Sequence, residues 1–312
     1  MRDDTAPKVL FIGGYGRSGS TLLDRVLGST DGFFSAGELR HIWLEGYVEN
    51  RLCGCGTPFR DCLFWREVTA VAFDRFGGLD ADEVLAAKER VDRYQRVGQL
   101  ATGVATRRRR EDLRWYGDRV RALYEGIRAV SGADVVIDSS KDVSHGYVLG
   151  ALEPPIDLHV VHLVRDSRAV AWSWRRKKYN PGSGRDMEQY SLLRTSSEWV
   201  AINALTAAHR RLGVPYLQLH YERFVDDPAG AVADVLDLVG EGHRRVPVRA
   251  DGTVELRAGH TVAGNPNRFT EGVVPIRADE EWRERMPRRD RAVVTTLTLP
   301  ALAGLGFLRT AS

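Results

Sequence analysis

The sequence has little lysine, no long apolar run and no large excess of either charge. Only 5 of its 45 basic residues are lysines, and the net charge over 312 residues is +3. This balance gives no indication of nucleic-acid binding. No segment approaches the roughly 20 apolar residues that a membrane-spanning helix needs, and no early stretch has the form of a signal peptide. We therefore expect a cytoplasmic protein without a transmembrane segment.

Cysteine is also scarce, and its three copies are clustered. Cys53, Cys55 and Cys62 form an odd-numbered set in a chain without secretory features, which argues against a disulfide framework. A zinc site would need a fourth ligand, for which His41 is a candidate, but the usual paired-cysteine spacing is absent. The cluster therefore predicts a packed turn of thiols, and we expect no metal.

Four short apolar runs predict buried strands of a mostly parallel sheet, at residues 9–12, 135–137, 158–164 and 216–219. Apolar spacings of three or four predict helices over 84–97 and 113–127, and later helices are expected at 167–178, 191–212 and 228–239. No internal repeat or low-complexity segment is present. The pattern predicts an α/β, P-loop-containing three-layer fold, with residues 1–312 as a single domain and a helical insertion at about 79–131 that walls an acceptor pocket.

A glycine-rich turn follows the first apolar run and opens a helix, the layout that cradles a phosphate. Gly14 and Gly19 have the spacing of a nucleotide P-loop, and Thr21 occupies the position of its hydroxyl residue. The lysine that reaches the β- and γ-phosphates is replaced by Ser20, and the nearest cation is Arg17. A loop that holds a 5′-phosphate beneath an arginine suits sulfuryl transfer better than ATP chemistry.

Three basic residues follow predicted strands. Arg17 lies after the first strand, Lys141 after the run that ends at residue 137, and Arg165 directly after residue 164. Ligands of open parallel sheets bind outside the carboxyl ends of the strands. We therefore expect these three side chains to converge on one polyanion.

Two sequence segments together resemble the sulfotransferases that use 3′-phosphoadenosine 5′-phosphosulfate (PAPS), especially the bacterial branch. They are Gly-Arg-Ser-Gly-Ser-Thr-Leu-Leu at 16–23 and Val-Arg-Asp-Ser-Arg-Ala-Val-Ala-Trp-Ser at 164–173, and the resemblance extends over roughly residues 8–285. It implies that the 5′-phosphosulfate is bound by Gly16, Arg17, Ser18, Gly19, Ser20 and Thr21. Arg17 takes the position of the family's catalytic lysine or arginine. The resemblance assigns the 3′-phosphate to Arg165 and Ser173, which are eight residues, or about two helical turns, apart.

Further segments are similar to parts of the same family. Gly37-Glu38-Leu39 resembles the segment of tyrosylprotein sulfotransferases whose glutamate is the base, and Asp-Ser-Ser-Lys-Asp at 138–142 resembles their lysine-containing segment. These similarities imply a base role for Glu38 and a transition-state contact for Lys141. The segment 260–269 resembles a late bacterial segment that closes over the nucleotide, which implies contacts from Asn265 and Arg268.

Each assignment has a structural alternative. Glu38 could cap a helix, Lys141 could pair with Asp138 or Asp142, Arg165 could pair with Asp166, and Arg268 could be a plain loop arginine. His41 and His145 are the substitutes for Glu38 as base. The Asn180-Pro-Gly-Ser-Gly segment is expected to form a rim of the site.

The combined interpretation is a PAPS-dependent sulfotransferase that releases 3′-phosphoadenosine 5′-phosphate (PAP) and needs no metal. Its acceptor is expected to be a hydroxyl, less readily an amine, on a small molecule or glycan. One alternative is a P-loop kinase or NTPase with Asp138 as its magnesium-side aspartate. Another is a catalytically inert nucleotide-binding module. Nothing in the sequence identifies the acceptor or the oligomeric state.

Overall fold

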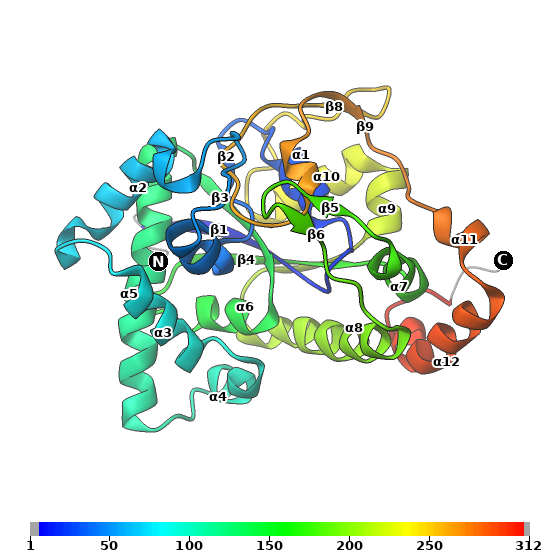
Figure 1. Cartoon of the computed structure of the whole chain (residues 1–312), viewed down its shortest axis with the longest axis horizontal. Coiled ribbons are helices and arrows are strands. Elements are labelled where there is room, and N and C mark those ends of the chain that lie inside the picture. Colours follow the sequence, from blue (N-terminus) through cyan, green and yellow to red (C-terminus); the bar gives the residue numbers. More distant parts are fainter. Residues whose placement is uncertain (1–5, 309–312) are drawn as a thin grey trace.

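The computed structural model describes residues 6–308, and its centre is a sheet of five parallel strands (Figure 1). The strands are β1 (Lys8–Gly13), β2 (Phe33–Ser35), β3 (Val135–Lys141), β4 (Asp157–Val164) and β7 (Tyr216–His220). Their order across the sheet is β2-β3-β1-β4-β7. The segments that follow β3, β1 and β4 therefore leave from neighbouring positions at one edge of the sheet.

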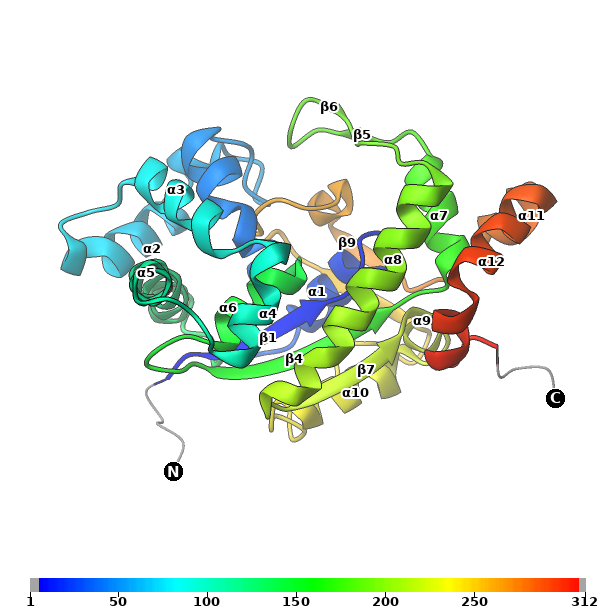
Figure 2. The same ribbon diagram turned by 90° about the horizontal axis from the view of Figure 1, so that it is seen from below.

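Helices lie on both faces of the sheet (Figure 1, Figure 2). They are α1 (Ser20–Leu27), α2 (Leu63–Phe73), α3 (Ala81–Val91), α4 (Val97–Thr102), α5 (Arg107–Ser131), α6 (Val143–Gly150), α7 (Ser167–Arg175), α8 (Leu192–Ala207), α9 (Tyr221–Asp226), α10 (Pro228–Leu238), α11 (Glu281–Arg285) and α12 (Arg288–Gly304). Two hairpins add β5 (Tyr179–Asn180) with β6 (Arg185–Asp186), and β8 (Thr253–Leu256) with β9 (Gly272–Pro275). Within residues 6–308, none of the helices is long and apolar enough to cross a membrane.

The helices and the sheet form the predicted three-layer α/β fold. In β1, Val9 and Phe11 belong to a buried cluster that continues into α2, α3, α5 and α6. Leu10 and Ile12 belong to a second cluster, which continues into α1 and α10. Because successive side chains of a strand point to opposite faces, a strand covered on both sides needs apolar residues throughout. This requirement explains why four of the five strands could be predicted from short, mainly apolar runs.

Helices α2 to α5 form a block at one end of the molecule, opposite α7, α11 and α12 (Figure 1). The buried face of α5 includes residues at spacings of three or four: Tyr116, Val120, Leu123, Tyr124 and Ile127. It packs against α2 and α3. Because α2 belongs to this packing, the helical block begins before the predicted boundary near residue 79.

The predicted helix over 84–97 is interrupted. Helix α3 ends at Val91, and α4 begins only at Val97. The carboxylate of Asp92 is buried and accepts hydrogen bonds from Arg40 (3.0 Å) and Ser144 (2.5 Å). These contacts hold Asp92 at φ −90° and ψ 75°, outside the helical region, so a continuous helix is excluded.

Candidate active site

The glycine-rich turn connects β1 to the start of α1 and depends on its glycines. Gly14 has φ 134°, and a Cβ there would lie 2.3 Å from the carbonyl oxygen of Leu163. Gly19 has φ 91°, and its Cβ would lie 2.6 Å from the ring of Tyr221. These positions exclude larger residues and leave backbone N–H groups exposed at the start of α1, where an anion is stabilised.

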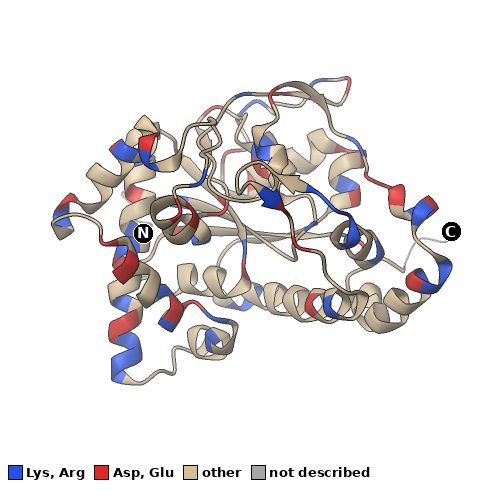
Figure 3. Cartoon of the chain, in the orientation of Figure 1, with Lys and Arg blue, Asp and Glu red and all other residues tan. Residues whose placement is uncertain are grey.

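A cavity of about 780 Å³ lies next to this turn and brings together Arg17, Lys141, Arg165 and Glu38. The predicted site residues that line it are Gly16, Arg17, Gly19, Ser20, Thr21, Glu38, Lys141, Arg165, Ser173 and Asn265. Its lining contains nine basic and three acidic side chains, an excess of six positive charges in a chain of net charge +3. Both charges alternate along α5, whereas basic segments gather where the β5–β6 hairpin crosses the middle of the molecule (Figure 3). The cavity is therefore built for a polyanion.

Arg17 is held within the lining and keeps free donors. Its guanidinium lies 4.7 Å over the ring of Trp174, and Nη1 contacts the Met187 sulfur at 3.3 Å. Within residues 6–308, its buried Nε and Nη2 atoms have no hydrogen-bond partner. Burial lowers the pKa of Arg17, and the charge of Arg176 lowers it further. A buried guanidinium with unpaired N–H groups is suited to binding an anion.

Arg165 follows β4 and reaches across the same edge of the sheet. Its Nη1 donates to the carbonyl oxygen of Arg17 (3.1 Å), its Nη2 donates to that of Asp279 (2.6 Å), and its guanidinium lies 4.3 Å over the Tyr221 ring. The predicted alternative, a pair with Asp166, is wrong, because Asp166 caps α7 and binds Arg168 instead. Arg165 is therefore fixed against the glycine-rich turn.

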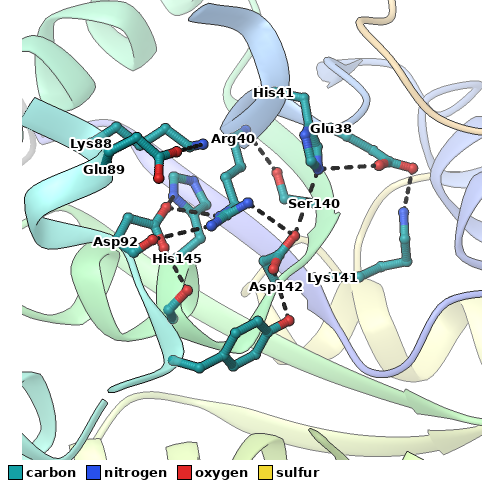
Figure 4. Close-up of polar contacts among 12 residues, drawn as sticks. Glu38, Arg40, His41, Lys88, Glu89, Asp92, Ser140, Lys141, Asp142 and His145 are labelled. Carbon is teal, nitrogen blue, oxygen red and sulfur yellow. Dashed lines mark hydrogen bonds and ion pairs between the residues drawn. The ribbon is translucent and has the colours of Figure 1, made fainter. Parts of the chain in front are cut away.

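Glu38 and Lys141 form an ion pair in which Lys141 Nζ donates to Glu38 Oε1 (Figure 4). The Glu38 side chain makes no helix-capping hydrogen bond, so the capping alternative is wrong. Neither Asp138 nor Asp142 pairs with Lys141, because these carboxylates have other partners. Lys141 has φ 67° and Arg17 φ 68°, a region that side chains other than glycine rarely adopt. The backbone thus holds two of the predicted catalytic cations in conformations of higher energy.

The two histidines proposed as alternative bases lie in different environments. His145 lies beside Asp92 (3.3 Å; Figure 4). Its other ring nitrogen lies 3.1 Å from Asp138, and the buried ring does not line the cavity. His41 does line the cavity, and its Nε2 lies 3.6 Å from Asp142 and 3.9 Å from Glu38. His145 is therefore placed for a structural role in the interior, whereas His41 is placed where a base could reach a ligand in the cavity.

The buried His145 predicts a specific pH dependence of stability. Burial alone would lower its pKa, but hydrogen bonds and charges from Asp138 and Asp92 raise it from 6.5 to about 9. Because the folded-state pKa exceeds the unfolded value, this stabilisation is complete below pH 6.5 and is lost as the pH rises through about 9. We expect the free energy of unfolding to fall by about 2 to 4 kcal/mol over this range. Urea unfolding should show the fall in the native chain and not in His145→Asn; equal slopes in both proteins would contradict the prediction.

Arg268 and Asn265 belong to the late segment that was expected to close over the nucleotide. Asn265 lines the cavity, and its Oδ1 accepts a hydrogen bond from Lys178 (2.8 Å). Arg268 is buried and donates to the carbonyl oxygens of Thr261 (2.6 Å) and Leu52 (2.6 Å). Arg268 thus joins two loops and is not part of the cavity lining. Ser18, also predicted to bind the donor, is buried and likewise does not line the cavity.

Several lining residues were not predicted. Arg176 and Lys178 come from the basic run at 175–178, which was a usable signal for an anion site. Burial lowers the pKa of Lys178, and the charges of Arg17 and Arg176 lower it further. Asn180 also lines the cavity, which supports the predicted rim.

The helical insertion was predicted to form a wall of the acceptor pocket. None of the described residues between 63 and 131 lines this cavity. The predicted role of the insertion as a pocket wall is therefore wrong for this cavity. The apolar faces of its helices are buried where α5 packs against α2 and α3.

Comparisons with known proteins agree on one family. The model of the sulfotransferase family matches residues 7–243. Similar solved structures include a sulfotransferase domain from the curacin biosynthetic pathway (17% identity, 95% of this chain and 97% of that chain, TM-score 0.47). They also include the sulfotransferase domain of the Synechococcus PCC 7002 olefin synthase (19%, 94% and 94%, 0.43) and a sulfotransferase from Alicyclobacillus acidocaldarius (15%, 97% and 96%, 0.42). No curated protein matches significantly. Because the family model covers well over half of the sequence, the chain belongs to the sulfotransferase family.

Proposed function

We propose that this chain transfers the sulfuryl group of PAPS to a hydroxyl group, less readily an amine, of a small molecule or glycan. One observation carries the proposal: Arg17, Lys141, Arg165 and Glu38 line one cavity at the carboxyl edge of the sheet. This cavity offers fixed cations for the donor and one carboxylate for the acceptor. Family membership supports PAPS as the donor.

In the proposed mode, two sets of groups in the cavity lining bind the donor. The backbone N–H groups at the start of α1 and the hydroxyl of Thr21 hold the 5′-phosphosulfate. The unpaired Nε and Nη2 of Arg17 supply further donors to this anion. Arg165, which lies between β4 and α7, and Ser173, in the last turn of α7, hold the 3′-phosphate.

The transfer step uses the pair formed by Glu38 and Lys141. The acceptor oxygen forms a bond to sulfur while the bond from sulfur to the phosphate oxygen breaks. Glu38 takes the acceptor proton, and Lys141 with Arg17 stabilises the charge that develops on the leaving phosphate oxygen. Positioned donors of this kind contribute about 3 kcal/mol each.

The arrangement of carboxylates argues against the kinase alternative. Asp138, its candidate magnesium residue, is fully buried and bonded to Tyr124, Ser140 and His145. The acidic residues of the lining are paired with cations: Glu38 with Lys141, Glu45 with Arg51 and Asp279 with Arg176. A kinase needs free carboxylates beside the phosphates to hold its magnesium.

Two assays test the proposed function. Thermal unfolding with PAP in the absence of Mg²⁺ should show protection of the chain, because a ligand that binds only the folded state raises its stability. Transfer of ³⁵S from labelled PAPS should then be found for at least one hydroxyl acceptor in a panel of alcohols, sugars and phenols. Protection by ATP and Mg²⁺ but not by PAP would support the kinase. PAP protection without transfer to any acceptor would support the inert module.

The 3′-phosphate assignment predicts a ligand-specific loss of affinity. Arg165→Ala should weaken PAP binding about 10- to 100-fold, the effect of removing a charge-assisted hydrogen-bond partner. Adenosine 5′-phosphosulfate, which lacks the 3′-phosphate, should bind equally well to the native and altered chains. Arg168→Ala is the matched control, because Arg168 lies only three residues after Arg165 and pairs with Asp166 outside the cavity. Calorimetric titration measures both ligands, and equal losses for the two would refute the assignment.

A further inference from the structure

The three cysteines and one histidine bring four ligand atoms together at a place outside the cavity. The Sγ atoms of Cys53, Cys55 and Cys62 and a ring nitrogen of His260 all lie within 4.8 Å of one another. His260 Nδ1 is 3.3 Å from the Cys62 sulfur and 3.7 Å from the Cys53 sulfur, and the sulfurs of Cys55 and Cys62 are 3.8 Å apart. The histidine considered from the sequence, His41, lies elsewhere, beside Glu38 and Asp142.

Three of the six separations among these ligand atoms are close to the edges of a zinc tetrahedron. Zinc binds thiolate sulfur at about 2.3 Å and imidazole nitrogen at about 2.0 Å, which places tetrahedral ligand atoms about 3.5 to 3.8 Å from one another. The three measured separations lie within about 0.2 Å of that interval. The cysteines are also free thiols and form no disulfide. Soft sulfur donors with one imidazole form a ligand set that selects zinc.

Contacts with the surrounding chain position Cys53, Cys62 and His260. Cys53 lies in a tight turn in which its amide donates to the Thr57 carbonyl (2.8 Å), and Gly56 supplies the positive φ of 82°. Cys62 directly precedes α2, and two residues in the first turn of this helix hold the histidine. Phe64 stacks on the His260 ring at 4.7 Å, and Trp65 Nε1 donates to the His260 carbonyl (2.9 Å).

We propose that Cys53, Cys55, Cys62 and His260 bind one zinc ion as a structural site. Four protein ligands fill the tetrahedron and leave no position open for water or substrate, which is the arrangement of structural rather than catalytic zinc. Three thiolates give the bound site a net negative charge. The buried guanidinium of Arg268 donates to the carbonyl of Leu52, the residue before Cys53, so a cation contacts the loop that carries Cys53.

The zinc joins two segments that are about 200 residues apart in the sequence. The segment that contains His260 continues to Val262, whose carbonyl accepts from the Glu38 amide (2.8 Å) and whose amide donates to Ala36 (2.8 Å). It then reaches Asn265 in the cavity lining. The metal thus fixes the loop that supports Glu38, and it does so whether or not the proposed sulfuryl transfer takes place.

Metal analysis of the purified full-length chain tests the site without donor or acceptor. The native protein should contain about one zinc per chain, and His260→Ala and Cys55→Ser should lose most of it. His220→Ala is the matched control, because His220 is half-buried and its ring also lies 4.7 Å from a phenylalanine, Phe307. This variant should keep its zinc.

A second measurement covers variants that fail to fold. After chelator treatment, the native chain should bind cobalt(II) with the visible and near-ultraviolet absorption of a tetrahedral thiolate site, and zinc should displace the cobalt. Removal of zinc should also lower the unfolding temperature, and zinc addition should restore it. The proposal is overturned if the reduced native chain binds neither ion, if His260→Ala keeps full zinc, or if mass spectrometry shows a disulfide between Cys55 and Cys62.

Discussion

Replacing Arg17 by alanine is expected to lower kcat about 10²- to 10³-fold, the usual effect of removing one positioned donor to a developing negative charge. Arg17 is suited to this role because its guanidinium is held against Trp174 while two of its nitrogens remain unpaired within the described residues. Lys141→Ala should give a loss of similar size, since its ammonium lines the same cavity. Initial rates of ³⁵S transfer at saturating PAPS measure both changes.

The controls separate charge from folding. Arg17→Lys keeps a cation in the position where the resemblance allows lysine or arginine, so it should recover part of the lost rate. Far-ultraviolet circular dichroism and the unfolding temperature should match the native chain in each variant. A folded Arg17→Ala or Lys141→Ala protein with native kcat would remove that residue from the mechanism.

Glu38→Gln is expected to lower kcat about 10²- to 10⁴-fold, because the amide keeps the shape of the side chain but takes no proton. Its oxygen can still accept from Lys141, so the local geometry should be retained. Initial rates of ³⁵S transfer to one active acceptor at saturating PAPS measure the loss.

Glu45→Gln is the matched control for this experiment. Glu45 also lines the cavity, but its carboxylate pairs with Arg51 (2.8 Å) and not with Lys141. Its substitution should leave kcat close to the native value. A native rate in Glu38→Gln would contradict the base role of Glu38 and favour His41, the other candidate base in the lining.

The apolar pattern of the strands and the topology of a parallel sheet were enough to predict the centre of the fold. They also predicted that three basic side chains line one cavity. Arg17, Lys141 and Arg165 each follow a strand, and β1, β3 and β4 are neighbours in a parallel sheet. Such convergence follows from the direction of the strands alone. The strand β2 escaped prediction because three residues at a sheet edge leave no distinct apolar run.

Contacts between distant loops could not be predicted in this way. Arg268 donates to Leu52 across 216 residues, and His260 meets Cys62 across 198. Neither contact follows from spacing or periodicity, because each depends on how two irregular segments pack. The sequence predicted Arg268 as a nucleotide ligand, whereas in the structure its two terminal nitrogens donate to backbone carbonyls.

The contact between Glu38 and Lys141 bears on side reactions of the proposed enzyme. While the two are in contact, one carboxylate oxygen of Glu38 accepts a hydrogen bond from the ammonium of Lys141. That oxygen is then less available to take a proton from a water molecule in the cavity. In the proposed mechanism, we expect an acceptor hydroxyl to enter between the two side chains, so that the carboxylate takes its proton while the ammonium contacts the leaving oxygen. We therefore expect slow hydrolysis of the activated sulfate until an acceptor is bound, which couples donor consumption to product formation.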